Sequence, residues 1–491
     1  DVMVAIFKEV LGKKHRVIIT RFDSQENLDI FGEKFGIPAG TLSPLTKEVT
    51  LPSKQIVTKK VVSKKQQRTS AKTDLQYSLW QGMPYFKNEK NEAYAAIRFN
   101  FDTEVYSDEM FSDIYEQTIF ERDKSARYPT KKEFANRTAC LRIVGGETIT
   151  RYPMYVVSKG RADCCKTSKY LTMNETPHYV VVEEFEYEKY QETVGQSPYT
   201  TVLTIPQRFF DEYETLYDFE AKGEKRLTGP GAARNFCWWH SKQEGHKAHH
   251  VLDDNLKGFY YISHNCKIKT RTSAWIRAME DYFDACDNVA QMGPNYTSFF
   301  VKDEKKPPLT LNTRIYSWIL IRNDLWDEGF RWRGSWNEDT ILSLDFLTAG
   351  YSTIQWNAFT QNKQGTQELR GGNTEEFYAK EGTTRKSQML ADVYPEYARV
   401  VFKFSRIHHE VDYSPFASID PQFHPERLAQ GYNDYGMYMV KIRPEDDARR
   451  LTGRDTKSQI EANYDEVIYK LDGTNWQNGF DVYKDFIEKG Y

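Results

Sequence analysis

The sequence predicts an α/β protein with a mainly parallel central sheet, preceded by small α+β units. Short apolar runs at 152–157, 177–182 and 201–205 have the length and composition of buried strands, and helix-like segments separate them. Strands that alternate with helices form parallel sheets covered on both faces. Ligands of such sheets bind beyond the carboxyl ends of the strands, so polar residues at those ends are candidate site residues.

Composition limits the classes of function. A length of 491 residues permits two or three domains, and a net charge of −3 means that any nucleic-acid surface must be local. No apolar run reaches membrane-spanning length, so no membrane partner is expected. The six cysteines are scattered and contain no CxxC pair, which favours reduced thiols in a cytoplasmic protein over disulfides or a zinc site.

The N-terminal third predicts two small units joined by a basic segment. A strand at 16–22 precedes a helix that begins after Ser24, and a second strand at 93–101 precedes an acidic helix near 104–115. Between Pro52 and Thr73 the chain has seven Lys or Arg residues and no acid, which indicates either a solvated tether or an arm that attracts phosphate. The predicted parts are a first unit at 1–50, a basic linker at 51–75, a second unit at 76–148, the main domain at 149–416 and a C-terminal extension at 417–491.

Two adjacent acids and an amide follow an apolar strand. Asp253, Asp254 and Asn255 are hard oxygen ligands of the kind that suit Mg²⁺ or Mn²⁺, whose remaining ligands are commonly waters and substrate phosphates. A solvated loop is the alternative interpretation of adjacent acids. Ser158, Arg161 and Glu183 also follow predicted strands, and this coincidence favours a binding site.

A stretch of small residues, Gly229 to Ala233, leads to Arg234 and Asn235. A Trp-rich helix is predicted from Phe236 to His250, and its N-terminus would favour an anion. Arg234 could hold a diphosphate or a base, or be structural. The histidines of this region are expected on the helix surface; they are His240, His246, His249 and His250.

Glu338 and Asp339 begin a predicted helix. The spacing of Ile341, Leu344 and Leu347, closed by a glycine at 350, indicates the helix and its C-cap. Acids at this position stabilise the helix dipole, and one of them could also be a general base.

Two later segments carry candidate ligands. Lys363 and Arg370 lie in a polar, glycine-containing stretch that could be a mobile cover over phosphates or an ordinary surface loop. His408 and His409 stand between Arg406 and Asp412, and such a pair is a candidate metal ligand or phosphate contact.

Taken together, these segments resemble the TET-associated glycosyltransferases of phages, which are relatives of the base J glucosyltransferases and have a GT-A fold. The resemblance covers about 151–416. It rests on Ser158-Lys-Gly-Arg161, Glu183, Arg234-Asn235, Asp253-Asp254-Asn255, Asn337-Glu338-Asp339, Arg370-Gly-Gly-Asn-Thr374 and Arg406-Ile-His-His409. Many GT-A enzymes have a third acid where this chain has Asn255.

The resemblance implies a role for each matched residue. Asp339, with Glu338 beside it, would be the general base of an inverting reaction. Donor binding would use Ser158, Arg161, Glu183, Arg234, Asn235, Asp253, Lys363 and Arg370. The metal would be held by Asp253, Asp254 or Asn255, completed by His408 or His409.

The implied function is a metal-dependent transfer of a sugar from a nucleotide sugar, expected to be a UDP-sugar, to DNA. The acceptor would be the hydroxymethyl group of 5-hydroxymethylcytosine or 5-hydroxymethyluracil in double-stranded DNA, and the setting would be the cytoplasm of an infected bacterial host. Alternatives are a protein, glycan or small-molecule acceptor, a catalytically dead DNA-binding relative, and, less well matched, a nuclease.

Overall fold

The computed structural model divides the chain into two compact units, which are described separately. Unit 1 contains residues 1–69, 90–137 and 485–491, and unit 2 contains 70–89 and 138–484. No helix of the described residues is long and apolar enough to cross a membrane. The structure describes residues 15–58, 67–88, 95–115, 125–128, 140–146, 150–218, 223, 227–299, 306–363, 384–403, 406–442 and 467–473.

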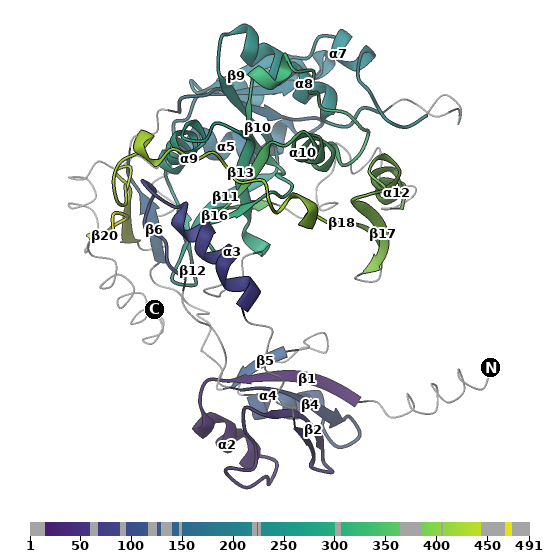
Figure 1. Cartoon of the computed structure of the whole chain (residues 1–491), viewed down its shortest axis with the longest axis vertical. Helices are drawn as coiled ribbons and strands as arrows, with labels where there is room; N and C mark the ends of the chain where they lie inside the picture. The colour runs from purple at the N-terminus through teal and green to yellow at the C-terminus, as the bar shows by residue number, and fades with distance from the viewer. Residues whose placement is uncertain are drawn as a thin grey trace. The chain divides into compact units, whose positions relative to one another are not determined.

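Unit 1 is a five-stranded sheet in the order β3-β2-β4-β1-β5, with two helices that contact it (Figure 1). Strand β1 pairs antiparallel with β4, so the segments predicted as separate units at 1–50 and 76–148 share one sheet. The Ser24 hydroxyl accepts the Asn27 amide at 3.1 Å, which confirms the predicted N-cap. The elements are β1 (His15–Phe22), α2 (Gln25–Glu33), β2 (Thr46–Leu51), β3 (Gln55–Thr58), β4 (Ala95–Asp102), α4 (Asp108–Tyr115) and β5 (Ser125–Tyr128).

Unit 2 is built on a 13-stranded sheet in the order β20-β19-β6-β12-β11-β16-β13-β15-β10-β7-β8-β9, and β14 pairs with β16 (Figure 1). Its strands are β6 (Cys140–Val144), β7 (Met154–Val157), β8 (His178–Val182), β9 (Thr200–Thr204), β10 (Ala248–Asp253), β11 (Leu256–Ser263), β12 (Cys266–Thr270), β13 (Val289–Tyr296), β14 (Leu309–Leu311), β15 (Trp318–Arg322), β16 (Ser352–Lys363), β19 (Tyr438–Ile442) and β20 (Val467–Lys470). Strands β17 (Ala398–Lys403) and β18 (Arg406–Val411) form a separate hairpin.

Helices accompany the strands of unit 2. They are α5 (Lys166–Met173), α6 (Tyr187–Thr193), α7 (Arg208–Asp211), α8 (Gly231–Gln243), α9 (Ala274–Asp284), α10 (Glu338–Thr348) and α12 (Thr384–Val393). Helix α3 (Gln67–Ser78) precedes Trp80, whose ring packs 4.9 Å from that of Trp356 in the core. Trp80 therefore belongs to the large core, although the sequence predicts it in the second small unit.

The α/β class is confirmed, and the sheet is mixed. Strands β9, β8, β7 and β10 form the continuous parallel block that the sequence predicts. Antiparallel pairs begin at β15 and recur between β11 and β12. The β11–β12 turn places His264 and Asn265 at φ 49° and 60°, the two left-handed positions of a tight hairpin. Because a tight hairpin joins antiparallel strands directly, β11 and β12 need no crossover helix between them.

The sheet extends beyond the main domain predicted at 149–416. Strand β6 pairs in parallel with β12, and β19 pairs antiparallel with β6. The first of these strands comes from the segment predicted as the second unit, and the other from the predicted C-terminal extension. Apolar residues of these strands pack in the core; the side chains of Ile143 and Met439, for example, are essentially inaccessible to solvent.

The predicted helix over 236–250 is shorter than expected, and its last residues belong to a strand. Helix α8 ends at Gln243, and Gly245, at φ 77°, turns the chain into β10. His249 and His250 are therefore fully buried, which corrects their predicted place on a helix surface. His250 lies 3.0 Å from Glu280 through Nε2, and its Nδ1 accepts the Trp318 indole N–H.

A buried histidine in strand β8 should make the stability of unit 2 depend on pH. Burial lowers the pKa of His178 to about 4; its Nδ1 donates to the Thr176 carbonyl, and its Nε2 accepts from Ser168. The contribution of neutral His178 to the free energy of unfolding is complete above about pH 6.5. It falls as the pH drops and is lost near pH 4, because over this range only the unfolded chain readily binds a proton at this histidine. We expect a loss of up to about 3 kcal/mol over this window.

Urea unfolding at several pH values measures this effect. His178→Gln keeps a polar side chain without a titrating ring and should flatten this part of the pH dependence. An equally steep pH dependence in wild type and variant would contradict the assignment. His249, whose pKa is also lowered by burial, remains in both proteins and contributes equally to both.

Candidate active site

The acidic pair lies at the end of an interior strand of the unit 2 sheet. Strand β10 lies between β7 and β15 and ends at Asp253. The backbone of this residue is held from two sides, because its N–H donates to the Ser317 carbonyl at 2.8 Å and its carbonyl accepts the Thr167 hydroxyl at 2.5 Å. The same hydroxyl accepts the Leu256 amide at 3.0 Å, so the turn that carries both acids is fixed.

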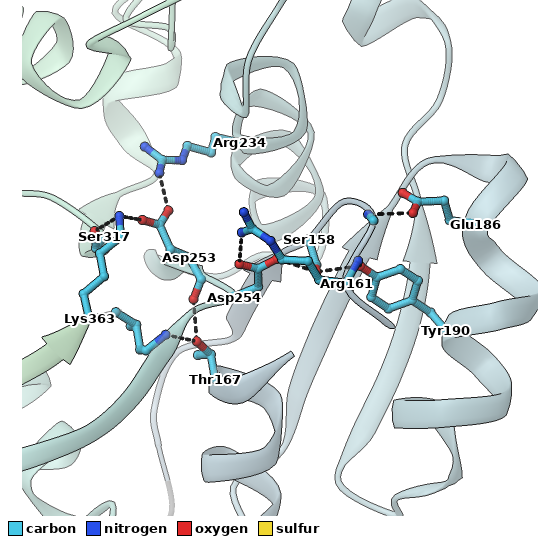
Figure 2. Close-up of polar contacts among 12 residues, drawn as sticks. Ser158, Arg161, Thr167, Glu186, Tyr190, Arg234, Asp253, Asp254, Ser317 and Lys363 are labelled. Carbon is cyan, nitrogen blue, oxygen red and sulfur yellow. Dashed lines mark hydrogen bonds and ion pairs between the residues drawn. The ribbon is translucent and has the colours of Figure 1, made fainter. Parts of the chain in front are cut away.

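Asp253 lies between two cations. Its Oδ1 accepts Arg234 Nη2 at 2.8 Å, and its Oδ2 accepts Lys363 Nζ at 2.6 Å (Figure 2). Burial by itself would raise the pKa of this carboxyl, but the charges of Lys363 and Arg234 outweigh burial and hold it well below its usual range. Asp253 is therefore ionised at any pH at which the protein works.

Asp254 points away from Asp253 into a different network (Figure 2). Its carboxylate accepts Arg161 Nη1 and the Ser158 hydroxyl, each at 2.7 Å. Burial raises its pKa in spite of Arg161. Only 4% of the Asp254 side chain is exposed, against 21% for Asp253, so Asp253 is the acid that a ligand can reach.

The predicted donor-binding residues after β7 and β8 belong to one set of linked contacts. Tyr190 links the first two, because its hydroxyl lies 2.7 Å from Ser158 Oγ and accepts the Arg161 backbone N–H at 2.9 Å. Glu183 forms an ion pair with Lys159 at 2.9 Å. The neighbouring Glu186 accepts the Gly160 amide at 2.7 Å (Figure 2). These side chains shape the loop at the sheet edge, and they place Asp254.

Arg234 lies inside helix α8, not in the loop before it. Its guanidinium packs 4.7 Å from the centre of the Trp332 ring and lies 3.2 Å from Glu338. Asn235 fixes that tryptophan, because its amide both donates to and accepts from the Trp332 backbone at 2.9 Å. Arg234 thus joins the acid after β10 to the first residue of helix α10.

Helix α10 begins at Glu338, as its apolar spacing predicts. Asn337, the N-cap, has φ 56°, and the two acids occupy the first turn. Burial raises the pKa of Glu338, and Arg234 opposes the shift. Asp339 is half-buried and uses Oδ1 to accept the Thr340 N–H at 2.7 Å. Its Oδ2 has no hydrogen bond or ion pair with a described residue, which leaves a carboxylate oxygen available to a ligand.

Lys363 is the last residue of strand β16, not part of a loop. Besides Asp253, its ammonium group donates to Ser317 Oγ at 2.9 Å. The Ser317 hydroxyl lies 2.5 Å from that of Tyr296. Arg370, the other predicted counter-charge of this segment, lies outside the described residues.

A cavity of about 370 Å³ adjoins this cluster. It is lined by residues that include Tyr316, Arg314, Tyr413 and His409. Tyr296 contacts both places: its hydroxyl lies near that of Ser317, and its ring centre lies 4.3 Å from the ring centre of Tyr316 in the cavity wall. The charge of Asp339 interacts with Arg234 and Lys363 on one side and with Arg314 and His409 on the other.

The predicted metal ligands do not form a ready-made centre. The described residues contain no group of three or more His, Cys, Asp or Glu that could hold an ion. Asp254 is bound to Arg161, and His409 lines the cavity, where burial, Lys386 and Arg314 lower its pKa to about 4. Asp253 is ionised and is more exposed than Asp254, but its two oxygens already accept from Arg234 and Lys363. The metal roles of Asn255 and His408 remain predictions.

Several residues of the site carry no sequence signal. Thr167, Tyr190 and Ser317 fix the two acids, but none follows an apolar strand or belongs to a motif. Ser317 has φ 66° on a residue other than glycine, which marks a constrained turn only once the backbone is known. Trp332 stands close to the predicted acids in sequence, but its contact with Arg234 depends on the packing of α8.

Comparison with known proteins agrees with this geometry. Residues 152–372 match the family model described as TET-Associated Glycosyltransferase. No curated protein matches the sequence. The matched segment runs from the start of β7 past the end of β16 and includes Asp253, Arg234, Asp339 and Lys363. Residues 152–372 are therefore similar to the TET-associated glycosyltransferases, and the protein is a glycosyltransferase.

Proposed function

We propose that the enzyme moves a sugar from a nucleotide-sugar donor, a UDP-sugar, to the hydroxymethyl group of 5-hydroxymethylcytosine or 5-hydroxymethyluracil in DNA. The observation that carries the proposal is the position of Asp253, ionised between Arg234 and Lys363 at the end of β10, within the segment that matches this family. Ligands of α/β sheets bind at such strand ends, and the donor diphosphate would meet this charged cluster.

The charges of the cluster favour an additional cation. Asp253, Glu338 and Asp339 outnumber Arg234 and Lys363, so these five side chains do not by themselves neutralise a diphosphate. Mg²⁺ or Mn²⁺ held by Asp253 and the diphosphate would supply Lewis-acid neutralisation of the leaving group. Lys363 would contribute its charge to the same phosphates.

The protein side chains divide the remaining work. Asp339 takes the proton of the acceptor hydroxyl, whose oxygen forms the new bond to the anomeric carbon as the bond to the diphosphate breaks. Glu338 holds Arg234, and Arg234 holds Asp253. Ser158, Arg161 and Tyr190 keep the loop after β7 in place beneath the donor.

A panel of nucleotide sugars tests the proposal. The full chain is incubated with each donor and with duplexes that contain hydroxymethylcytosine, hydroxymethyluracil or neither, or with peptide and glycan acceptors, and the products are analysed by mass. We expect sugar on a hydroxymethylated nucleoside only, with loss of transfer in chelator and recovery on adding Mn²⁺ or Mg²⁺. Transfer to peptides or glycans and not to DNA would overturn the acceptor, and full turnover in chelator would overturn the metal requirement.

A further inference from the structure

Two positively charged side chains line the cavity beside the active site. Arg314 and Lys306 line it, and neither side chain forms an ion pair or hydrogen bond with a described residue. Burial lowers the pKa of Lys306, as expected for an ammonium group that gives up water without gaining a partner. A cation placed in this way is stabilised by an anionic ligand.

The same cavity offers flat aromatic surfaces. Tyr316, Tyr413 and Phe299 lie on its wall, and the Phe299 side chain is about half exposed. The Arg314 guanidinium lies over the Tyr316 ring, 5.0 Å from its centre, so the cation and an aromatic side chain stand next to each other in the cavity wall. Aromatic faces beside phosphate-binding cations are the usual means of holding an unstacked base.

Polar groups are also available at the cavity wall. The Tyr413 hydroxyl is buried next to the Arg314 backbone without a hydrogen bond of normal geometry. Gln355 lines the cavity, where its amide nitrogen makes a long contact of 3.4 Å with the Arg314 carbonyl and its side chain also contacts Tyr316. Such groups can exchange weak contacts for hydrogen bonds to the edge of a base.

We propose that this cavity receives the acceptor as a single pyrimidine nucleotide extruded from the duplex. Its base would lie against Tyr316 and Tyr413, and its phosphate would meet Arg314 and Lys306. The inference rests on the proposed function and adds the route by which DNA enters the site. A cavity of about 370 Å³ accommodates one nucleotide and excludes a duplex.

The position of the general base supports this placement. The charge of Asp339 interacts with Arg314, Tyr316 and Tyr413, all of which line the cavity. It also interacts with Arg234 and Lys363 at the donor end. The hydroxymethyl group of a base bound in the cavity would therefore lie near the Asp339 carboxylate if it pointed towards the donor. A base that stayed in the major groove would make no use of the cavity.

The first test changes Arg314 with a matched control. Arg314→Ala should raise KM for hydroxymethylated duplex by roughly tenfold, the effect expected for losing one charge-assisted phosphate contact. The affinity for UDP, measured by calorimetry, should not change. Arg208→Ala is the control, because Arg208 also lies over an aromatic ring, that of Trp239 at 4.5 Å, but is exposed and outside the cavity lining. A loss of UDP affinity in Arg314→Ala would assign the cavity to the donor instead.

The second test measures extrusion itself. A 2-aminopurine next to the hydroxymethylated base should brighten on binding wild type and much less on binding Arg314→Ala or Tyr413→Ala. Placing the acceptor in a mismatch should lower KM by roughly tenfold, because unpairing is already complete. Efficient transfer without brightening and with equal KM for matched and mismatched DNA would overturn extrusion. Absence of transfer to any DNA by wild type would instead overturn the proposed function.

Discussion

Asp339→Asn is expected to lower kcat for sugar transfer by about 10³-fold, within the range for loss of a general base. The amide cannot accept the acceptor proton. It does keep an oxygen for the Thr340 amide, which Asp339 Oδ1 accepts at 2.7 Å, so helix α10 should begin as before. Rapid-quench assays at saturating donor and DNA measure kcat, and calorimetry with UDP checks that the donor site is intact.

A matched variant separates the base from general charge effects. Asp392→Asn removes an acid from the exposed face of helix α12, where it accepts a hydrogen bond from Gln388, and should leave kcat unchanged. Glu338→Gln is informative as well, because it weakens the ion pair with Arg234 while Asp339 remains. If Asp339→Asn kept kcat within a few-fold of wild type, the proton would have to leave through another group.

The elements around the site could be predicted wherever the sequence pattern is local. Strand β8 and helix α10 were expected because apolar runs and apolar spacing are decided within a few residues. The placement of Asp253 at a strand end followed from the same reasoning. Lys363 was expected near phosphates but in a loop, since a strand as long as β16, with twelve residues, has no clear end in the sequence.

Long-range pairing could not be predicted in the same way. Strands β6, β19 and β20 join the large sheet from outside the predicted domain, and their partners are distant in sequence. His249 and His250 look polar, but Trp318, Glu280 and Asn323 supply buried partners from three other segments. The cavity has the same origin, because Arg314, Gln355 and Tyr413 are brought together only by packing.

The two neighbouring acids should give opposite results when each is changed to the amide. Asp253→Asn should reduce transfer by at least about 10²-fold, because it removes a partly exposed, ionised carboxylate at the proposed diphosphate position. Without a divalent ion the same change should strengthen UDP binding, since Arg234 and Lys363 then face the diphosphate with one negative charge fewer. With Mn²⁺ present, UDP binding should weaken if Asp253 is the metal ligand.

Asp254→Asn should act mainly on stability. This side chain is 4% exposed and is held by Arg161 and Ser158, so losing its charge removes a largely buried ion pair. We expect a decrease of about 3 kcal/mol in the free energy of unfolding. Any fall in activity should be recovered at lower temperature, where the folded fraction is restored. Urea unfolding measures the loss of stability, and activity assays at two temperatures show whether activity recovers with the folded fraction. A stable Asp254→Asn enzyme without activity, beside an active Asp253→Asn enzyme, would reverse the assignment of the two carboxylates.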